Sequence, residues 1–109
     1  MPDLRTVYFV APGCVELREE PLPVPVSGLV LVETLVSAIS PGTEMLIYRG
    51  QFPRNLAVDA NIEPLRGEFH YPLPYGYACV GKVVKLGPDV DRAWLERLVF
   101  AFQPHTSHF

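Results

Sequence analysis

Two histidines near the carboxyl end of the chain, His105 and His108, are the first residues whose type and spacing could do chemistry. Imidazoles are common metal ligands, but a zinc site needs three or four ligands with a supporting hydrogen-bonded shell. Cys14, Cys79 and His70 are the other candidate ligands, and none stands at the spacing of a metal motif. We therefore expect no metal, and we interpret the histidine segment as a loop that lines a pocket.

A phosphate loop is the second chemistry that the sequence approaches. The run from Gly76 to Val83, GYACVGKV, is one residue short of a Walker A motif. That motif needs Ser or Thr where Val83 stands, to hold Mg²⁺, and it must open a helix. The residues from Lys82 onward are typical of a strand, so we reject this interpretation. The chain also has no G-x-G-x-x-G run, and so carries no dinucleotide fingerprint of its own.

A nucleophilic serine is a further candidate, and the sequence does not favour it. Ser107 stands beside two histidines, but the glycines of a nucleophile elbow and a nearby orienting carboxylate are missing. Adjacent carboxylates occur at Glu19 and Glu20, and two more, Asp89 and Asp91, are separated by one residue. These stretches are typical of turns, so we interpret the carboxylates as solvated surface groups.

The elements that must position these residues are short strands separated by turns. Residues 6–10 and 14–19 are β-branched, aromatic or alternating, which predicts a hairpin across a Pro-Gly turn. Thr43 is expected to cap one short helix that Gly50 closes. Further strands are predicted over 28–40, 77–86 and 98–102, a helical turn over 91–96, an extended connection over 20–27, and a long irregular loop over 51–74.

Length and composition bound the class of protein. The chain has 109 residues, which is enough for one domain. Hydrophobic residues make up 49%, so the chain can bury a core, and the net charge of −3 argues against a nucleic-acid surface. No apolar run is long enough to span a membrane, and no export signal is visible, so we expect a cytoplasmic protein. Twelve prolines disfavour long helices. The sequence therefore predicts a mostly β fold, either a barrel or a sandwich, with few helices.

Three segments together resemble the N-terminal, GroES-like catalytic domain of the medium-chain dehydrogenase/reductase superfamily, also described as zinc-type alcohol dehydrogenase-like. They are Ser37–Glu44 (SAISPGTE), Tyr75–Val90 (YGYACVGKVVKLGPDV) and Glu96–Phe102 (ERLVFAF). The resemblance extends over essentially the whole chain, and the middle segment is the most specific. It is similar to the family's G-H-E-x-x-G-x-V-x-x-V-G run. Within the superfamily, the chain is distantly similar to the bacteriochlorophyllide dehydrogenases.

The departures from the family pattern concern zinc. Pro41 stands where zinc-dependent members have a cysteine ligand, and Tyr77 stands where they have a histidine, followed by Ala78 in place of a glutamate. The four-cysteine lobe that holds a structural zinc is also missing. Neither proline nor tyrosine supplies a thiolate or an imidazole. The resemblance is therefore to the zinc-independent branch.

The resemblance implies a mostly β fold, a GroES-like, partly open β-barrel with one or two short helices. It also implies an NAD(P)(H)-dependent oxidoreductase acting on a small molecule. Without zinc another donor must stabilise the charge that develops on the substrate oxygen, and the hydroxyls of Thr43 and Tyr77 are the expected catalytic groups. Cofactor contacts are expected from Pro41, Gly42 and Thr43. The walls of the substrate pocket are expected from Glu44, Gln103 and His105.

The domain that holds the dinucleotide is expected outside this chain. Residues 1–109 form the GroES-like unit, and a Rossmann domain would be a partner, so we expect no turnover from this chain alone. Removing such a partner exposes apolar surface, which predicts self-association through Pro41–Thr43 or the segment ending at Phe109. The alternative is a GroES-like barrel that acts as a binding or assembly module without catalysis.

Overall fold

Five strands and one short α-helix provide the regular structure of the described residues, which are 3–51 and 70–109 of the computed structural model. The expected mostly β fold with little helix is confirmed. Most of the long loop expected over 51–74 lies outside the described residues. In chain order the elements are β1 (Leu4–Ala11), β2 (Cys14–Glu20), β3 (Val30–Ser37), α1 (Thr43–Arg49), β4 (Cys79–Leu86), the 3₁₀ turn η3 (Arg92–Trp94) and β5 (Leu98–Ala101).

Strands β1 and β2 form the expected antiparallel hairpin, in which Val7 pairs with Leu17. The turn between the strands contains Pro12 and Gly13, and Gly13 adopts a φ of 72°. That left-handed conformation costs glycine little because it has no Cβ. The turn residues and the apolar alternation therefore both predict the hairpin that the structure contains.

Strands β3, β4 and β5 form a second antiparallel sheet in that order. Val32 of β3 pairs with Val83 at its centre, and both side chains are buried. Gly81 lets the two strands approach closely, since an added Cβ would stand 2.4 Å from a methyl of Val32. Gly81 and Lys82 thus lie within a strand, as expected, and not in a phosphate-binding loop.

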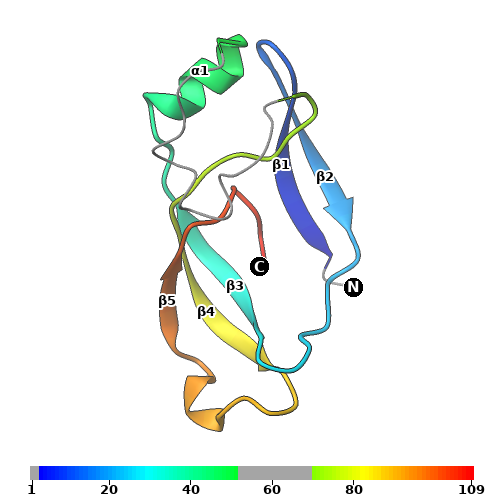
Figure 1. Ribbon diagram of the computed structural model, residues 1–109, viewed down its shortest axis with the longest axis vertical. Coiled ribbons are helices and arrows are strands. Elements are labelled where there is room, and N and C mark those ends of the chain that lie inside the picture. Colours follow the sequence, from blue (N-terminus) through cyan, green and yellow to red (C-terminus); the bar gives the residue numbers. More distant parts are fainter. Residues whose placement is uncertain (1–2, 52–69) are drawn as a thin grey trace.

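The carboxyl-terminal segment, residues 105–109, joins the two sheets. Thr106 forms a β-bridge with Thr6 of β1, and His108 forms another with Glu33 of β3. Figure 1 shows this segment running in red between the two strands. The described strands do not close into a barrel, so the expectation of a partly open barrel is correct. The sequence indicated a loop here, and its bridging role was not expected.

Helix α1 has the expected length and a different amino-terminal cap. The cap residue is Gly42, and no side chain supplies a capping hydrogen bond, so the prediction of Thr43 as the cap is wrong. The reason is that the backbone of Gly42 is already helical (φ −74°, ψ −74°), so the cap lies one residue earlier in the chain than predicted. Gly50 ends the helix with a φ of 78°, as expected.

A small aromatic core lies between α1 and β1. Phe9, Ile47 and Tyr75 are buried there, and Ile47 is fully inaccessible. Four partly buried side chains pack around them: Tyr48, Tyr71, Leu73 and Tyr77. Within the described ranges, the helices are too short to cross a membrane. This core fixes the position of α1, and with it the residues at the start of the helix.

Candidate functional site

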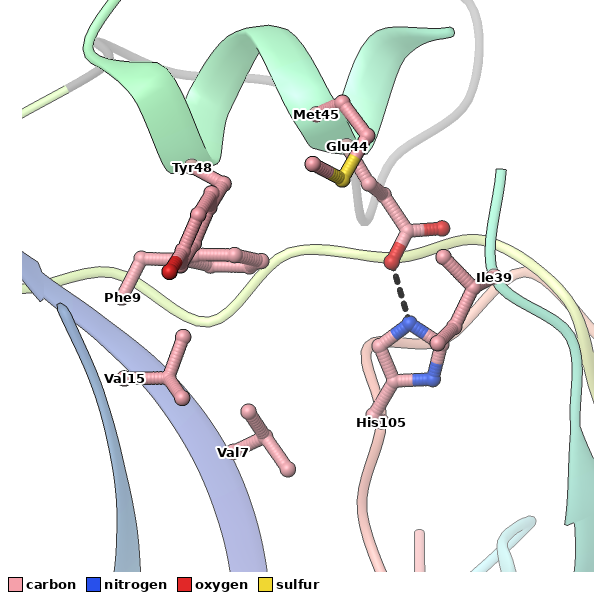
Figure 2. Close-up of a pocket in the computed structure, with 8 residues that line it drawn as sticks. All are labelled: Val7, Phe9, Val15, Ile39, Glu44, Met45, Tyr48 and His105. Atoms are coloured by element: carbon pink, nitrogen blue, oxygen red, sulfur yellow. Dashed lines mark hydrogen bonds and ion pairs between the residues drawn. The ribbon is translucent and has the colours of Figure 1, made fainter. Parts of the chain in front are cut away.

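A hollow of about 260 Å³ lies between helix α1, the β1–β2 hairpin and the carboxyl-terminal segment. Its wall is apolar except for Glu44 and His105. Figure 2 shows both side chains on one side, facing Phe9 and Tyr48 across the hollow. The lining residues are Val7, Phe9, Val15, Ile39, Glu44, Met45, Tyr48 and His105. An apolar pocket with a few convergent polar groups is the usual form of a small-molecule site.

Glu44 is a buried carboxylate, with only 3% of the residue exposed. It stands in the first turn of α1, where a negative charge is favoured by the helix dipole. One oxygen, Oε2, accepts a hydrogen bond of 2.5 Å from the backbone N–H of Ser40. The other, Oε1, pairs with Nε2 of His105. A buried charge is tolerated when it is paired and hydrogen-bonded, and both conditions hold here.

His105 is held at both ring nitrogens. Nε2 faces Glu44, and Nδ1 lies 2.7 Å from Oγ of Ser37 at the end of β3. Its backbone carbonyl accepts from the N–H of Val7, which ties the residue to β1. Gly76 leaves room for the ring, since an added Cβ would stand 3.1 Å from its Cδ2 and Nε2 atoms. The imidazole therefore has a fixed orientation at the edge of the hollow.

Tyr77 joins the same cluster through Ser40. Its hydroxyl donates a hydrogen bond of 2.6 Å to Oγ of Ser40, whose backbone N–H in turn holds Glu44. Its ring packs edge-on against Tyr75, with centroids 6.3 Å apart. The hydroxyl of Tyr77 is thus engaged by the protein, and it could reach a substrate oxygen only by exchanging this bond.

The structure brings some of the expected site residues together and leaves others apart. Glu44 and His105 form one wall of the hollow, and Tyr77 is linked to them. Pro41 and Gly42 are exposed just before α1, and Thr43 is a half-buried residue at the start of the helix.

Gln103 is the expected pocket residue that lies elsewhere. It lines a second hollow, of about 580 Å³, together with Val99, Phe100 and Phe109. Its backbone carbonyl accepts a weak hydrogen bond of 3.6 Å from Sγ of Cys79. A convergence of the Thr43 and Tyr77 hydroxyls with Gln103 or His105 on one pocket stays a prediction.

Two members of the cluster, Ser37 and Ser40, were missed as functional residues. Both lie in the Ser37–Glu44 segment that carries the family resemblance. The spacing of Ser40 and Glu44 is a local signal, because a carboxylate in the first turn can reach back to an amide before the helix. The contact between Ser37 and His105 spans 68 positions, so no local pattern could have found it.

Cys79 borders this cluster and is fully buried. Its thiol donates to the carbonyl oxygen of Pro104 over 3.3 Å. Burial raises the pKa of the Cys79 thiol, the negative charge of Glu44 raises it further, and a backbone hydrogen bond at Thr106 partly opposes both. The thiol is therefore held in its unreactive protonated form, since the thiolate is the nucleophile.

Among the described residues, no metal-binding arrangement surrounds Pro41 or Tyr77. Within residues 3–51 and 70–109, no three side chains of His, Cys, Asp or Glu gather closely enough to hold a metal. Pro41 offers no ligand atom, and Tyr77 is bonded to Ser40. The chemistry that the described cluster supports is acid–base chemistry at an imidazole and a carboxylate.

Comparison with known proteins finds sequence similarity to a dehydrogenase. The search of protein-family models finds no match. Over 88 residues the chain is 37% identical to the 2-desacetyl-2-hydroxyethyl bacteriochlorophyllide A dehydrogenase of Cereibacter sphaeroides. The aligned region covers 79% of this chain and 24% of that protein, so the chain spans about a quarter of the length of its relative. The chain is thus distantly related to a dehydrogenase, which supports a distant relationship to the medium-chain enzymes.

Proposed function

We propose that this chain is the substrate-side, GroES-like half of a zinc-independent, NAD(P)-dependent oxidoreductase of a small molecule. The observation that carries the proposal is an apolar hollow with a single buried carboxylate–imidazole pair on its wall. The distant dehydrogenase relative supports the reaction class. The name of that relative contains a hydroxyethyl group, so a hydroxyl or carbonyl substituent on an apolar body is the substrate that we propose.

The cofactor must be held elsewhere. A nicotinamide dinucleotide supplies or accepts the hydride when it is bound. In the described part of the chain, the loop at Pro41 and Gly42 is open to solvent but has no charged side chain to fix a pyrophosphate. The residues present therefore do not fit a complete dinucleotide site, and we derive no step through it. A Rossmann domain is the proposed partner, in a cytoplasmic protein.

The proposal assigns the handling of charge on the substrate oxygen to this chain. Thr43 and Tyr77 remain the proposed donors of hydroxyl groups, and His105 with Glu44 adds an acid–base pair beside the hollow. In the chain joined to a cofactor domain, Thr43→Val and Tyr77→Phe should each lower turnover by about ten- to a thousandfold. Full activity in both variants would remove these two residues from the mechanism.

Binding to the hollow can be tested on the chain alone. In NMR titrations, 1-phenylethanol and acetophenone should shift the signals of Phe9, Met45 and His105. Val15 lies on the rim with 51% of its surface exposed, so Val15→Trp should narrow the hollow without disturbing the core. We expect it to weaken binding by about tenfold, or 1.4 kcal/mol.

A matched control is available on the same strand. Leu17 is 59% exposed and does not line the hollow, so Leu17→Trp should leave binding unchanged. If both tryptophan variants weaken binding equally, or if the probes shift only residues around Phe100, the hollow is not the substrate site.

A binding or assembly module without catalysis is the second proposed function. Apolar side chains on β5 favour it, because Leu98 is 66% exposed and Phe100 is 59% exposed. Exposed apolar patches of this kind commonly mark interaction surfaces. Pro41–Thr43 and the segment ending at Phe109 stay the proposed faces for self-association, and the exposed side chains of β5 add a further one. Sedimentation velocity at increasing concentration tests this, and a strictly monomeric chain would count against it.

A further inference from the structure

Three side chains from three separate elements form a continuous hydrogen-bonded line. Ser37 comes from the end of β3, His105 from the carboxyl-terminal segment, and Glu44 from the start of α1. The Ser37 hydroxyl lies 2.7 Å from Nδ1 of His105, and Nε2 of the same ring pairs with Glu44. A hydroxyl within reach of a base that a third group orients is the structural signature of an activated nucleophile.

The surroundings of Glu44 determine which nitrogen of His105 can act as the base. A carboxylate only accepts hydrogen bonds, so the ring must donate its proton from Nε2. In the neutral ring this leaves the lone pair on Nδ1, which faces the hydroxyl of Ser37. The carboxylate cannot turn away, because its other oxygen is held by the backbone N–H of Ser40.

The hollow beside this line offers space for one apolar group. His105 and Glu44 are part of its wall, and Ile39, two residues after Ser37, is another part. Its volume of about 260 Å³ and its lining of Val7, Phe9 and Met45 fit a short acyl chain or a small aromatic acid. Ser37 itself is half-buried, and its hydroxyl meets this wall through the ring of His105.

We propose that Ser37, His105 and Glu44 form an acyl-transfer site for small apolar carboxylic esters, a second activity that needs no nicotinamide cofactor. Oγ of Ser37 attacks the ester carbonyl carbon, and its proton passes to Nδ1 of His105. The bond between the carbonyl carbon and the alcohol oxygen breaks, and the leaving alcohol takes that proton. Water then gives a proton to Nδ1 and adds to the acyl carbon. The bond to Oγ breaks, Ser37 recovers its proton from Nδ1, and a carboxylic acid leaves.

A second line of the same residue types provides an internal control. Oγ of Ser107 lies 2.9 Å from Nδ1 of His108, and Nε2 of that ring lies 3.7 Å from Oε2 of Glu33. Here the carboxylate is 54% exposed, against 4% for the Glu44 side chain. Ser107 also accepts a hydrogen bond from the backbone N–H of Arg5. The exposed carboxylate orients its ring weakly, so Ser107 should not be activated.

The test is covalent labelling of the purified chain with a short-chain alkyl fluorophosphonate. The reagent forms an O–P bond with an activated hydroxyl and releases fluoride, while the hydroxyl proton passes to the base. Peptide mapping by mass spectrometry should place the label on Ser37 in the unaltered chain. Ser37→Ala should abolish labelling and hydrolysis of p-nitrophenyl butyrate, and Ser107→Ala should change neither.

The base and its carboxylate are tested in the same assay. Glu44→Gln and His105→Gln should each slow the labelling of Ser37 by about a hundredfold, which is the usual contribution of a general base. Circular dichroism checks that each variant is folded. If Glu44→Gln or His105→Gln does not fold, Ser37→Ala still tests the proposal, because it is the smallest change of the three. Three outcomes would overturn the proposal: no label on the unaltered chain, a label on Ser107, or an unchanged rate of Ser37 labelling in His105→Gln.

The labelling assay contains no cofactor and no alcohol or ketone probe. Failure of labelling therefore leaves the proposed oxidoreductase pocket intact, whereas failure of probe binding in the hollow leaves the reactivity of Ser37 intact.

Discussion

The described residues contain two Ser–His–Glu lines that use the same atoms and differ in the burial of the carboxylate. In both, the serine is at Nδ1 and the glutamate at Nε2. Glu44 is buried and accepts from a backbone N–H, while Glu33 is mostly exposed and 3.7 Å from its histidine. The histidine side chains themselves are almost equally covered, at 13% and 11% exposed. The carboxylate therefore decides how firmly each ring is held.

This difference teaches that residue types do not define a reactive site without their environment. A charge pair in water is screened and competes with solvent, so it contributes little. A charge pair that is removed from water has no alternative partner, so its geometry is retained and the loss of one member is costly. The line that ends at Glu44 is a candidate for chemistry, and the line that ends at Glu33 helps to join the carboxyl-terminal segment to β3.

The largest expected contrast is in stability. Glu44→Ala would leave both the N–H of Ser40 and the ring of His105 without their buried partner, and it should lower the free energy of unfolding by about 3 kcal/mol. Glu33→Ala removes a solvent-exposed partner, and it should cost about 0.5 kcal/mol or less. Urea unfolding of both variants measures the difference. Equal losses of unfolding free energy in the two variants would show that burial of the carboxylate does not distinguish the two lines.

A smaller contrast is expected in the response to salt. Double-mutant cycles at His105 and Glu44 and at His108 and Glu33 give the coupling free energy of each pair. Salt screens exposed charges, so the coupling of His108 with Glu33 should be below about 1 kcal/mol and vanish near 1 M NaCl. The coupling of His105 with Glu44 should persist, because the Glu44 side chain is only 4% exposed and is therefore screened much less. If the coupling of His105 with Glu44 falls with salt as much as that of His108 with Glu33, the Glu44 pair is open to solvent.

The smallest expected effect is on Cys79. The charge of Glu44 contributes to the raised pKa of this thiol, so Glu44→Gln should move the pKa down toward its ordinary value, while burial still keeps it high. The alkylation rate of Cys79 as a function of pH, measured in a Cys14→Ser background, should show a midpoint shifted to lower pH. Glu33→Gln should leave the midpoint in place. Opening of the structure would also lower the midpoint, because it removes the burial of Cys79, so circular dichroism must show that Glu44→Gln is folded as the unaltered chain is.

Where the structure departs from the sequence-based expectations, the cause is a contact between distant segments. Ser107 was discounted because no orienting carboxylate stands near it in sequence. In the structure Glu33 lies near His108, the residue after Ser107, because the carboxyl-terminal segment pairs with β3. Ser37 was not considered at all, although it lies in a segment that the resemblance had already marked. Gln103 and His105 were both expected on one pocket wall because they follow the last strand, where the resemblance places that wall, and in the structure they line different hollows.

The sequence by itself determined the elements whose rules are local. The Pro12–Gly13 turn, the strands beside it, the glycine that ends α1 and the strand through Gly81 follow from periodicity, turn chemistry and the absence of a Cβ. These properties act over a few neighbouring residues, so a single stretch of chain contains all the information they need.

Only the tertiary structure decided which polar residues are buried together. Glu44 and His105 are 61 positions apart, and their pairing depends on how the carboxyl-terminal segment passes between two sheets beneath α1. The strength of such a pair depends on the exclusion of water, which packing from several elements achieves and no local pattern encodes. The chain carries two copies of one chemical arrangement, and the path of the backbone buries the carboxylate of one of them.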